Sequence, residues 1–171
     1  MNSGSSLRTA IAECSALALL FTAFMPVQSY CQIYGSATNR ITVTVQAITV
    51  LQVSAGIVNL GIAGSNAIAG QDQMVVTDQS SSLLWGTNSS LKKVTVQSNL
   101  ATPKFTLNVV AVNPTAGSAA AEATLTTTAA DFLLNIGRSS GTCSLLYTGV
   151  ALASQGTGTD SHTITFTVQA Q

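Results

Sequence analysis

The segment Ile41-Thr42-Val43-Thr44-Val45-Gln46-Ala47 alternates apolar and polar side chains along almost its whole length. Successive side chains of a β-strand point to opposite faces, so Ile41, Val43 and Val45 would share one face and the threonines the other. Residues 164–170 repeat this segment as Ile-Thr-Phe-Thr-Val-Gln-Ala, with a phenylalanine at 166 as the one difference. Both segments therefore predict strands with one apolar and one threonine-rich face.

The same period of two continues between these segments. After Ala47 the alternation shifts to Thr49, Leu51 and Val53, which predicts a bulge or a change of sheet. Further runs bounded by Gly, Ser, Asn or Pro predict strands over residues 57–63, 73–78, 82–87, 92–98, 104–112, 123–128, 143–151 and 163–170. We therefore expect an all-β chain forming a single antiparallel β-sandwich of about eight or nine strands, of immunoglobulin-like type.

The intervening segments predict short connections and one helical turn. Thr87-Asn88-Ser89-Ser90 predicts a hairpin loop. Residues 128–134 lose the alternation and predict a helical turn that places Phe132 and Leu133 in the core. Residues 61–70, rich in Gly, Ala and Ser, predict a long surface loop, and Trp85 is expected to anchor the core.

The first 31 residues are typical of a secretory signal peptide. Arg8 precedes an apolar run over residues 14–27, which Glu13 keeps too short to span a bilayer. Cleavage is expected after Ser29 or after Cys31. The predicted organisation is a signal peptide over residues 1–31, an N-terminal arm over 32–39 and a sandwich domain over 40–171, in a secreted or cell-surface protein with no integral membrane span in its mature chain.

The cysteines allow at most one intramolecular disulfide after processing. Cys14 lies in the leader, so the mature chain holds Cys143 alone or Cys31 with Cys143. Cleavage after Ser29 would leave a Cys31–Cys143 bridge open to formation in an oxidising compartment. Otherwise Cys143 is expected to be a small buried apolar residue of a strand.

Charge is scarce and balanced, at 7% of residues with a formal net charge of zero. Such a surface gives no electrostatic basis for binding nucleic acid and little repulsion between copies of the chain. Catalysis needs positioned titratable groups, and the sequence holds one histidine. Asp160, Ser161 and His162 are adjacent, and adjacent strand residues face opposite sides, so they do not form a catalytic triad among themselves. We expect no enzyme activity, no catalytic residues, no metal site and no cofactor.

The near identity of the two threonine-rich segments has two interpretations: both are generic half-buried strands with threonine outward, or they take part in strand exchange. If they are interchangeable in one sheet position, the N-terminal arm of one copy could complete an exposed sheet edge of the next and build a head-to-tail filament. The candidate strand-exchange residues are Ile41, Val43, Val45, Ile164, Phe166 and Val168. Neither segment contains a lysine that would oppose such pairing.

In pattern, residues 39–171 resemble small secreted bacterial surface proteins with immunoglobulin-like or fimbrial-subunit-like sandwiches. The resemblance is carried by the early Thr/Val strand, the hairpin containing Trp85 and the closing segment His162 to Val168. We expect a structural or adhesive protein of the cell surface or extracellular matrix that acts by self-association, as a homo-oligomer or filament, or by surface contact. The alternative is a secreted module that binds carbohydrate or protein, such as a surface glycan, through loops at residues 61–70 and 137–141.

Overall fold

The computed structural model describes residues 36–54 and 56–171. Residues 44–171 form one compact unit. Residues 36–43 belong to a separate unit, contain no helix or strand, and expose every side chain. Within the described chain, no helix has the length and apolar character needed to cross a bilayer.

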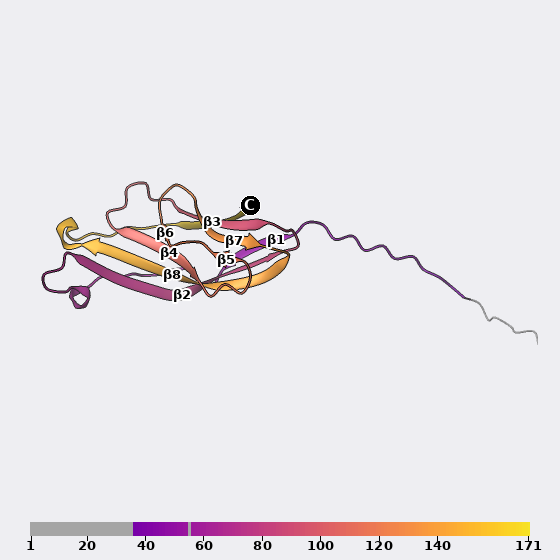
Figure 1. Cartoon of the computed structure of the whole chain (residues 1–171), viewed down its shortest axis with the longest axis horizontal. Helices are drawn as coiled ribbons and strands as arrows, with labels where there is room; N and C mark the ends of the chain where they lie inside the picture. The colour runs from indigo at the N-terminus through magenta and orange to yellow at the C-terminus, as the bar shows by residue number, and fades with distance from the viewer. Residues whose placement is uncertain (1–35, 55) are drawn as a thin grey trace, which may run out of the picture. The chain divides into compact units, whose positions relative to one another are not determined.

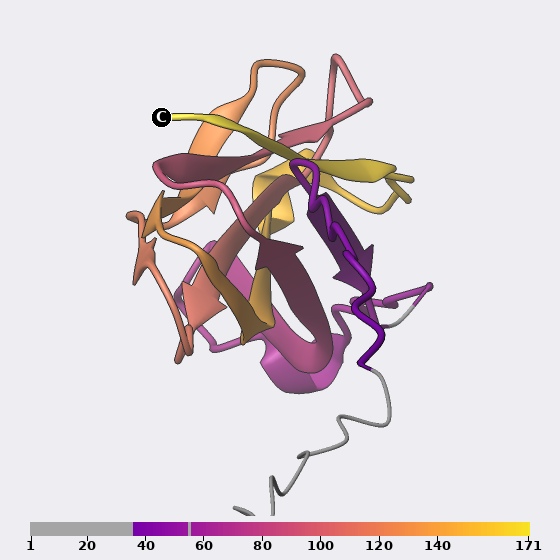
Figure 2. The same cartoon turned by 90° about the vertical axis from the view of Figure 1, so that its right-hand side faces the viewer.

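The compact unit is an antiparallel β-sandwich (Figures 1 and 2). One sheet has the strand order β1-β2-β8-β4-β6 and the other has the order β5-β7-β3-β9, so β1, β6, β5 and β9 lie at the sheet edges. The strands are β1 (Thr49–Val53), β2 (Gln73–Thr87), β3 (Lys92–Ser98), β4 (Thr106–Val112), β5 (Ser118–Ala119), β6 (Ala123–Thr124), β7 (Ala130–Ile136), β8 (Ser139–Leu152) and β9 (Ile164–Ala170). Short 3-10 helices, η2 (Gly64–Asn66) and η3 (Ala153–Gln155), interrupt two of the connections.

The core lies between the two sheets. Trp85 is 5% exposed and belongs to it, as predicted. Phe132 of β7 packs against Phe166 of β9 with ring centroids 5.2 Å apart in an edge-to-face arrangement. Each large apolar side chain buried here stabilises the fold by about 1.5–3 kcal/mol. The remaining core side chains include Leu83, Val94, Val96, Val109, Leu125, Leu133, Ile136 and Leu145.

Strand β2 is one long strand where the sequence predicted two, over residues 73–78 and 82–87. Its pairing with β8 shifts register between Asp78 and Ser81, which marks a bulge. Asp78 Oδ1 accepts hydrogen bonds from the backbone N–H and the hydroxyl of Ser80 within this bulge. Figure 1 shows β2 and β8 side by side over their length. The polar residues that suggested a break between strands are therefore the bulge of a continuous strand.

The predicted helical turn at residues 128–134 is wrong, because this segment contributes to strand β7. Phe132 and Leu133 are both buried although they are adjacent. The pairing of β7 with β3 shifts register at Val94, so the alternation of β7 is interrupted there. Their predicted place in the core is confirmed.

Two predicted strands, over residues 41–47 and 57–63, form no strand in the structure. Residues 57–63 nevertheless keep their alternation, because Val58, Leu60 and Ile62 are half-buried and the residues between them are exposed. Residues 56–62 make no backbone–backbone hydrogen bond with any described residue. The periodicity therefore predicted correctly which side chains face inward, but no neighbouring strand pairs with this segment.

Candidate functional site

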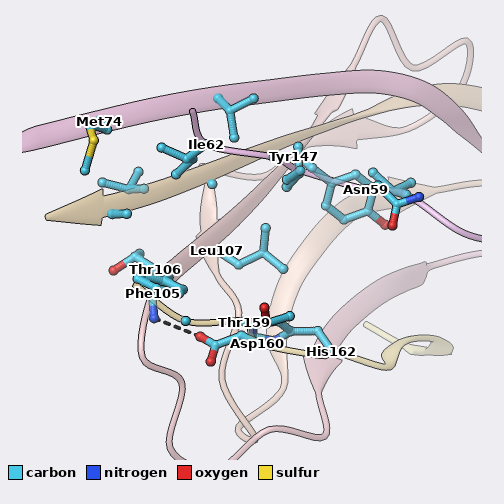
Figure 3. A pocket seen from close by; sticks show the side chains of 18 of the residues that line it. Asn59, Ile62, Met74, Phe105, Thr106, Leu107, Tyr147, Thr159, Asp160 and His162 are labelled. Carbon is cyan, nitrogen blue, oxygen red and sulfur yellow. Dashed lines mark hydrogen bonds between the residues drawn. The ribbon is translucent and has the colours of Figure 1, made fainter. Parts of the chain in front are cut away.

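A groove of about 1070 Å³ opens between the two sheets (Figure 3). Its floor is the inner face of the five-stranded sheet, where Met74 and Val76 of β2, Leu107 of β4 and Ala151 of β8 lie. The four-stranded sheet ends at β9 and does not cover this part of the floor. The groove therefore lies where the five-stranded sheet extends beyond the edge of the four-stranded sheet.

Two segments that line the groove carry unpaired backbone groups. One is β9, whose inner side chains Ile164 and Phe166 line the groove. β9 pairs with β3 on one side, and no described strand pairs with its other side. Segment 56–64 forms another part of the lining, and its residues 56–62 make no backbone–backbone hydrogen bond with a described residue. An added strand beside β9 would find backbone donors and acceptors available along that edge.

The groove is closed at one end and open at the other. At the closed end Ser81 and Tyr147 line the floor, and β1 contacts β9. At the open end Met74 lies beside connecting residues that include Ala153 and Thr157. Figure 3 shows Met74 and Tyr147 toward opposite ends of the groove.

Two polar side chains, Ser81 and Tyr147, lie at the closed end of an otherwise apolar floor. Ser81 is 1% exposed, and its hydroxyl has no hydrogen-bond partner among the described residues. Tyr147 is also buried, and burial, aided by the negative charge of Asp78, raises the pKa of its phenol to about 12. The phenol is therefore neutral at physiological pH.

The N-terminal residues predicted for strand exchange, Ile41, Val43 and Val45, are 78%, 82% and 72% exposed, and we call residues 39–47 the arm. Their counterparts on β9, including Val168, face inward and pack against the core. The structure thus leaves one copy of the repeated segment exposed and builds the other into a sheet edge.

Asn88 holds the start of the compact unit. Its Nδ2 donates to the carbonyl of Gln46 at 2.7 Å, and its Oδ1 accepts from the backbone N–H of Ile48 at 2.8 Å. The predicted hairpin at residues 87–90 is wrong, because these residues connect β2 to β3, which lie in different sheets and do not pair. The arm therefore leaves the compact unit beside the Thr87 end of β2, whereas the groove is floored by the other half of that strand.

Asp160 and His162, which flank Ser161, have separate structural partners. Asp160 Oδ2 accepts a hydrogen bond from the backbone N–H of Phe105 at 2.8 Å. His162 Nδ1 lies 2.8 Å from Ser98 Oγ. Asp160 thereby ties the connection before β9 to the start of β4, and His162 ties it to the end of β3.

Cys143 lies buried in β8, as predicted for a small apolar residue. Burial raises the pKa of its thiol to about 11, against a smaller opposing effect of the hydrogen bond with the Leu83 backbone. Because the thiolate is the reactive form, this thiol is unreactive at neutral pH. Cys31 lies outside the described residues, and the Cys31–Cys143 bridge stays a prediction.

In the described part of the chain, no three His, Cys, Asp or Glu side chains gather closely enough to hold a metal ion. Models of known protein families give no match to this chain, and a search of curated proteins finds no similar sequence.

Proposed function

We propose that this protein is an exported, non-catalytic structural or adhesive protein that self-associates by β-strand addition. Residues 41–47 of one copy would enter the groove of the next and pair with β9. The observation that carries this proposal is the open groove, with apolar side chains on its floor, beside an unpaired sheet edge, in a chain whose own arm exposes a matching apolar stripe. Each contact uses two different surfaces, so repeated addition would build an open filament rather than a closed dimer.

The groove and the arm agree in length and character. The floor extends from Met74 to Ser81, whose partners on β8, Ala151 and Leu145, are six residue steps apart, roughly 20 Å at about 3.3 Å a step. A strand of seven residues has about this length. Three inward apolar side chains would be removed from water, each contributing up to about 1.5–3 kcal/mol. The threonine face would stay toward solvent.

The reach of the arm favours addition between copies over filling of the same chain's groove. Asn88 holds Gln46 beside the end of β2, and Ile41 is five residues further, about 17 Å when extended. From Thr87 back to Met74 the strand runs thirteen steps, about 43 Å. With the Asn88 contacts intact, the segment that holds the apolar residues of the arm does not reach the open end of the groove in its own chain.

The alternative of a carbohydrate-binding or protein-binding module would be favoured by an exposed aromatic platform. All the aromatic residues in the described chain are buried or half-buried: Trp85, Phe105, Phe132, Tyr147 and Phe166. Residues 61–70 and 137–141 contain no aromatic side chain. We therefore favour self-association.

The proposal is tested by sedimentation and electron microscopy of the mature protein with two matched substitutions on β2. Met74 is half-buried in the groove, and its neighbour Val75 faces the opposite side and is more exposed. Met74→Asp should abolish filaments, whereas Val75→Asp should assemble like the unsubstituted protein. Unchanged melting temperatures would show that both variants fold. A wild-type protein that stays monomeric at high concentration, or filaments formed equally by Met74→Asp, would refute the proposal.

A further inference from the structure

The buried hydroxyl of Ser81 is the feature of the groove that simple apolar complementarity does not explain. Ser81 lies at the closed end and is 1% exposed, and its hydroxyl has no hydrogen-bond partner among the described residues. A buried polar group left unpaired costs about 1–3 kcal/mol. An occupant that brings a hydrogen-bonding group to this point would recover that free energy.

The direction of the arm in the groove follows from its connection to the rest of its own copy. Residues after Ala47 lead into β1 and the compact unit, which must stay outside the groove. Ala47 therefore lies toward the open end, and the N-terminal part of the arm lies toward Ser81. In this direction the arm runs antiparallel to β9, which enters the groove at Ile164 and passes Phe166 toward the closed end.

The arm carries one polar residue on its apolar face. The face that holds Ile41, Val43 and Val45 continues at every second position, and two residues before Ile41 it reaches Asn39. The stretch from Asn39 to Val45 spans six steps, about 20 Å, close to the length of the groove floor. The polar residue of this stretch lies at its N-terminal end, which in this direction faces the buried hydroxyl of Ser81 at the closed end of the groove.

We infer that Asn39 of one copy hydrogen-bonds to Ser81 of the next and thereby fixes the register of the added strand. This inference rests on the proposed function and names the specificity-determining pair of the same site. A carboxamide both donates and accepts, so it satisfies the serine hydroxyl in either orientation. A slip by one residue would bring Arg40 to this point and turn the apolar side chains to solvent. A slip by two would place Ile41 against the unpaired hydroxyl.

A double-mutant cycle on the full mature chain tests the pair. The measured quantity is the critical concentration for filament formation by sedimentation, for the wild type, Asn39→Ala, Ser81→Ala and the double variant. Thr42→Ala, on the opposite face of the arm, is the control. We expect Asn39→Ala to raise the critical concentration about tenfold, in keeping with a buried group losing its partner. We expect the double variant to be no worse than the poorer single variant.

The possible outcomes separate this inference from the proposed function. Filaments whose critical concentration is insensitive to Asn39→Ala, or in which the two substitutions act independently, would overturn the Asn39–Ser81 pair and leave strand addition standing. A wild-type chain that never assembles would overturn both. Since Asn39 lies outside the compact unit, its substitution tests the pair even if Ser81→Ala fails to fold.

Discussion

Replacing Val43 by aspartate should cripple assembly without touching the fold. Val43 is 82% exposed in the single chain, so its substitution removes no contact of the core. In the groove the valine would contribute about 1.5–2 kcal/mol by leaving water. An aspartate there would lose that contribution and would also bring a carboxylate against apolar side chains, at a further cost of a few kcal/mol. With part of the charge still hydrated, we expect a total of about 3–4 kcal/mol, which is about a 150- to 700-fold weaker association.

The control and the assay for this prediction are direct. Thr44→Asp adds the same charge to the solvent-facing side of the arm, where substitutions change the free energy by about 0.5 kcal/mol or less. Critical concentrations for both variants, measured by sedimentation at one salt concentration, should therefore differ by about two orders of magnitude. Equal values for Val43→Asp and Thr44→Asp would refute the assignment of an inward face to this segment.

Two further predictions concern the fold. Gly141→Ala should lower the free energy of unfolding by about 1–3 kcal/mol, because its Cβ would lie 2.6 Å from Cε2 of buried Trp85; Gly137→Ala, with nothing within 4 Å, should change it little in urea denaturation. The raised pKa values of Cys143 and Tyr147, about 11 and about 12 against ordinary values of 9.0 and 10.0, mean that the folded state holds their neutral forms. Their contribution is fully present below pH 9 and is lost as the pH rises through 9–11 for the thiol and 10–12 for the phenol. The free energy of unfolding should therefore fall between pH 9 and pH 11, and it should fall less steeply for the Cys143→Ala variant. A stability independent of pH over that range would contradict it.

Much of the fold follows from the sequence because half-buried strands alternate by necessity. The inward faces of 57–63 and 164–170 are both visible in the sequence. Strand pairing cannot be predicted in the same way. β9 pairs with β3 and residues 57–63 pair with no strand, although the two segments have similar alternating patterns. The two misread segments are bulged: a register shift places adjacent Phe132 and Leu133 in the core, and Ser80 closes a bulge inside β2. Bulges depend on the partner strand, which a local pattern does not contain.

The candidate site could be predicted from the sequence only in part. The repeated segment pointed to strand exchange, but the groove depends on which strand ends the second sheet, and that is a property of topology. Ser81 illustrates the limit. In the sequence it is one of three consecutive serines that follow Gln79, and only the bulge and the packing of β2 turn its hydroxyl inward without a partner.

Strand addition between copies is tested most directly by mixing two variants that cannot assemble alone. Val43→Asp keeps the groove and loses the arm, and Met74→Asp keeps the arm and loses the groove. Each should sediment as a monomer, and an equimolar mixture should give a one-to-one dimer that grows no further, because the arm of the Met74→Asp copy fills the groove of the other. A mixture that stays monomeric while the wild type forms filaments would contradict strand addition through this groove.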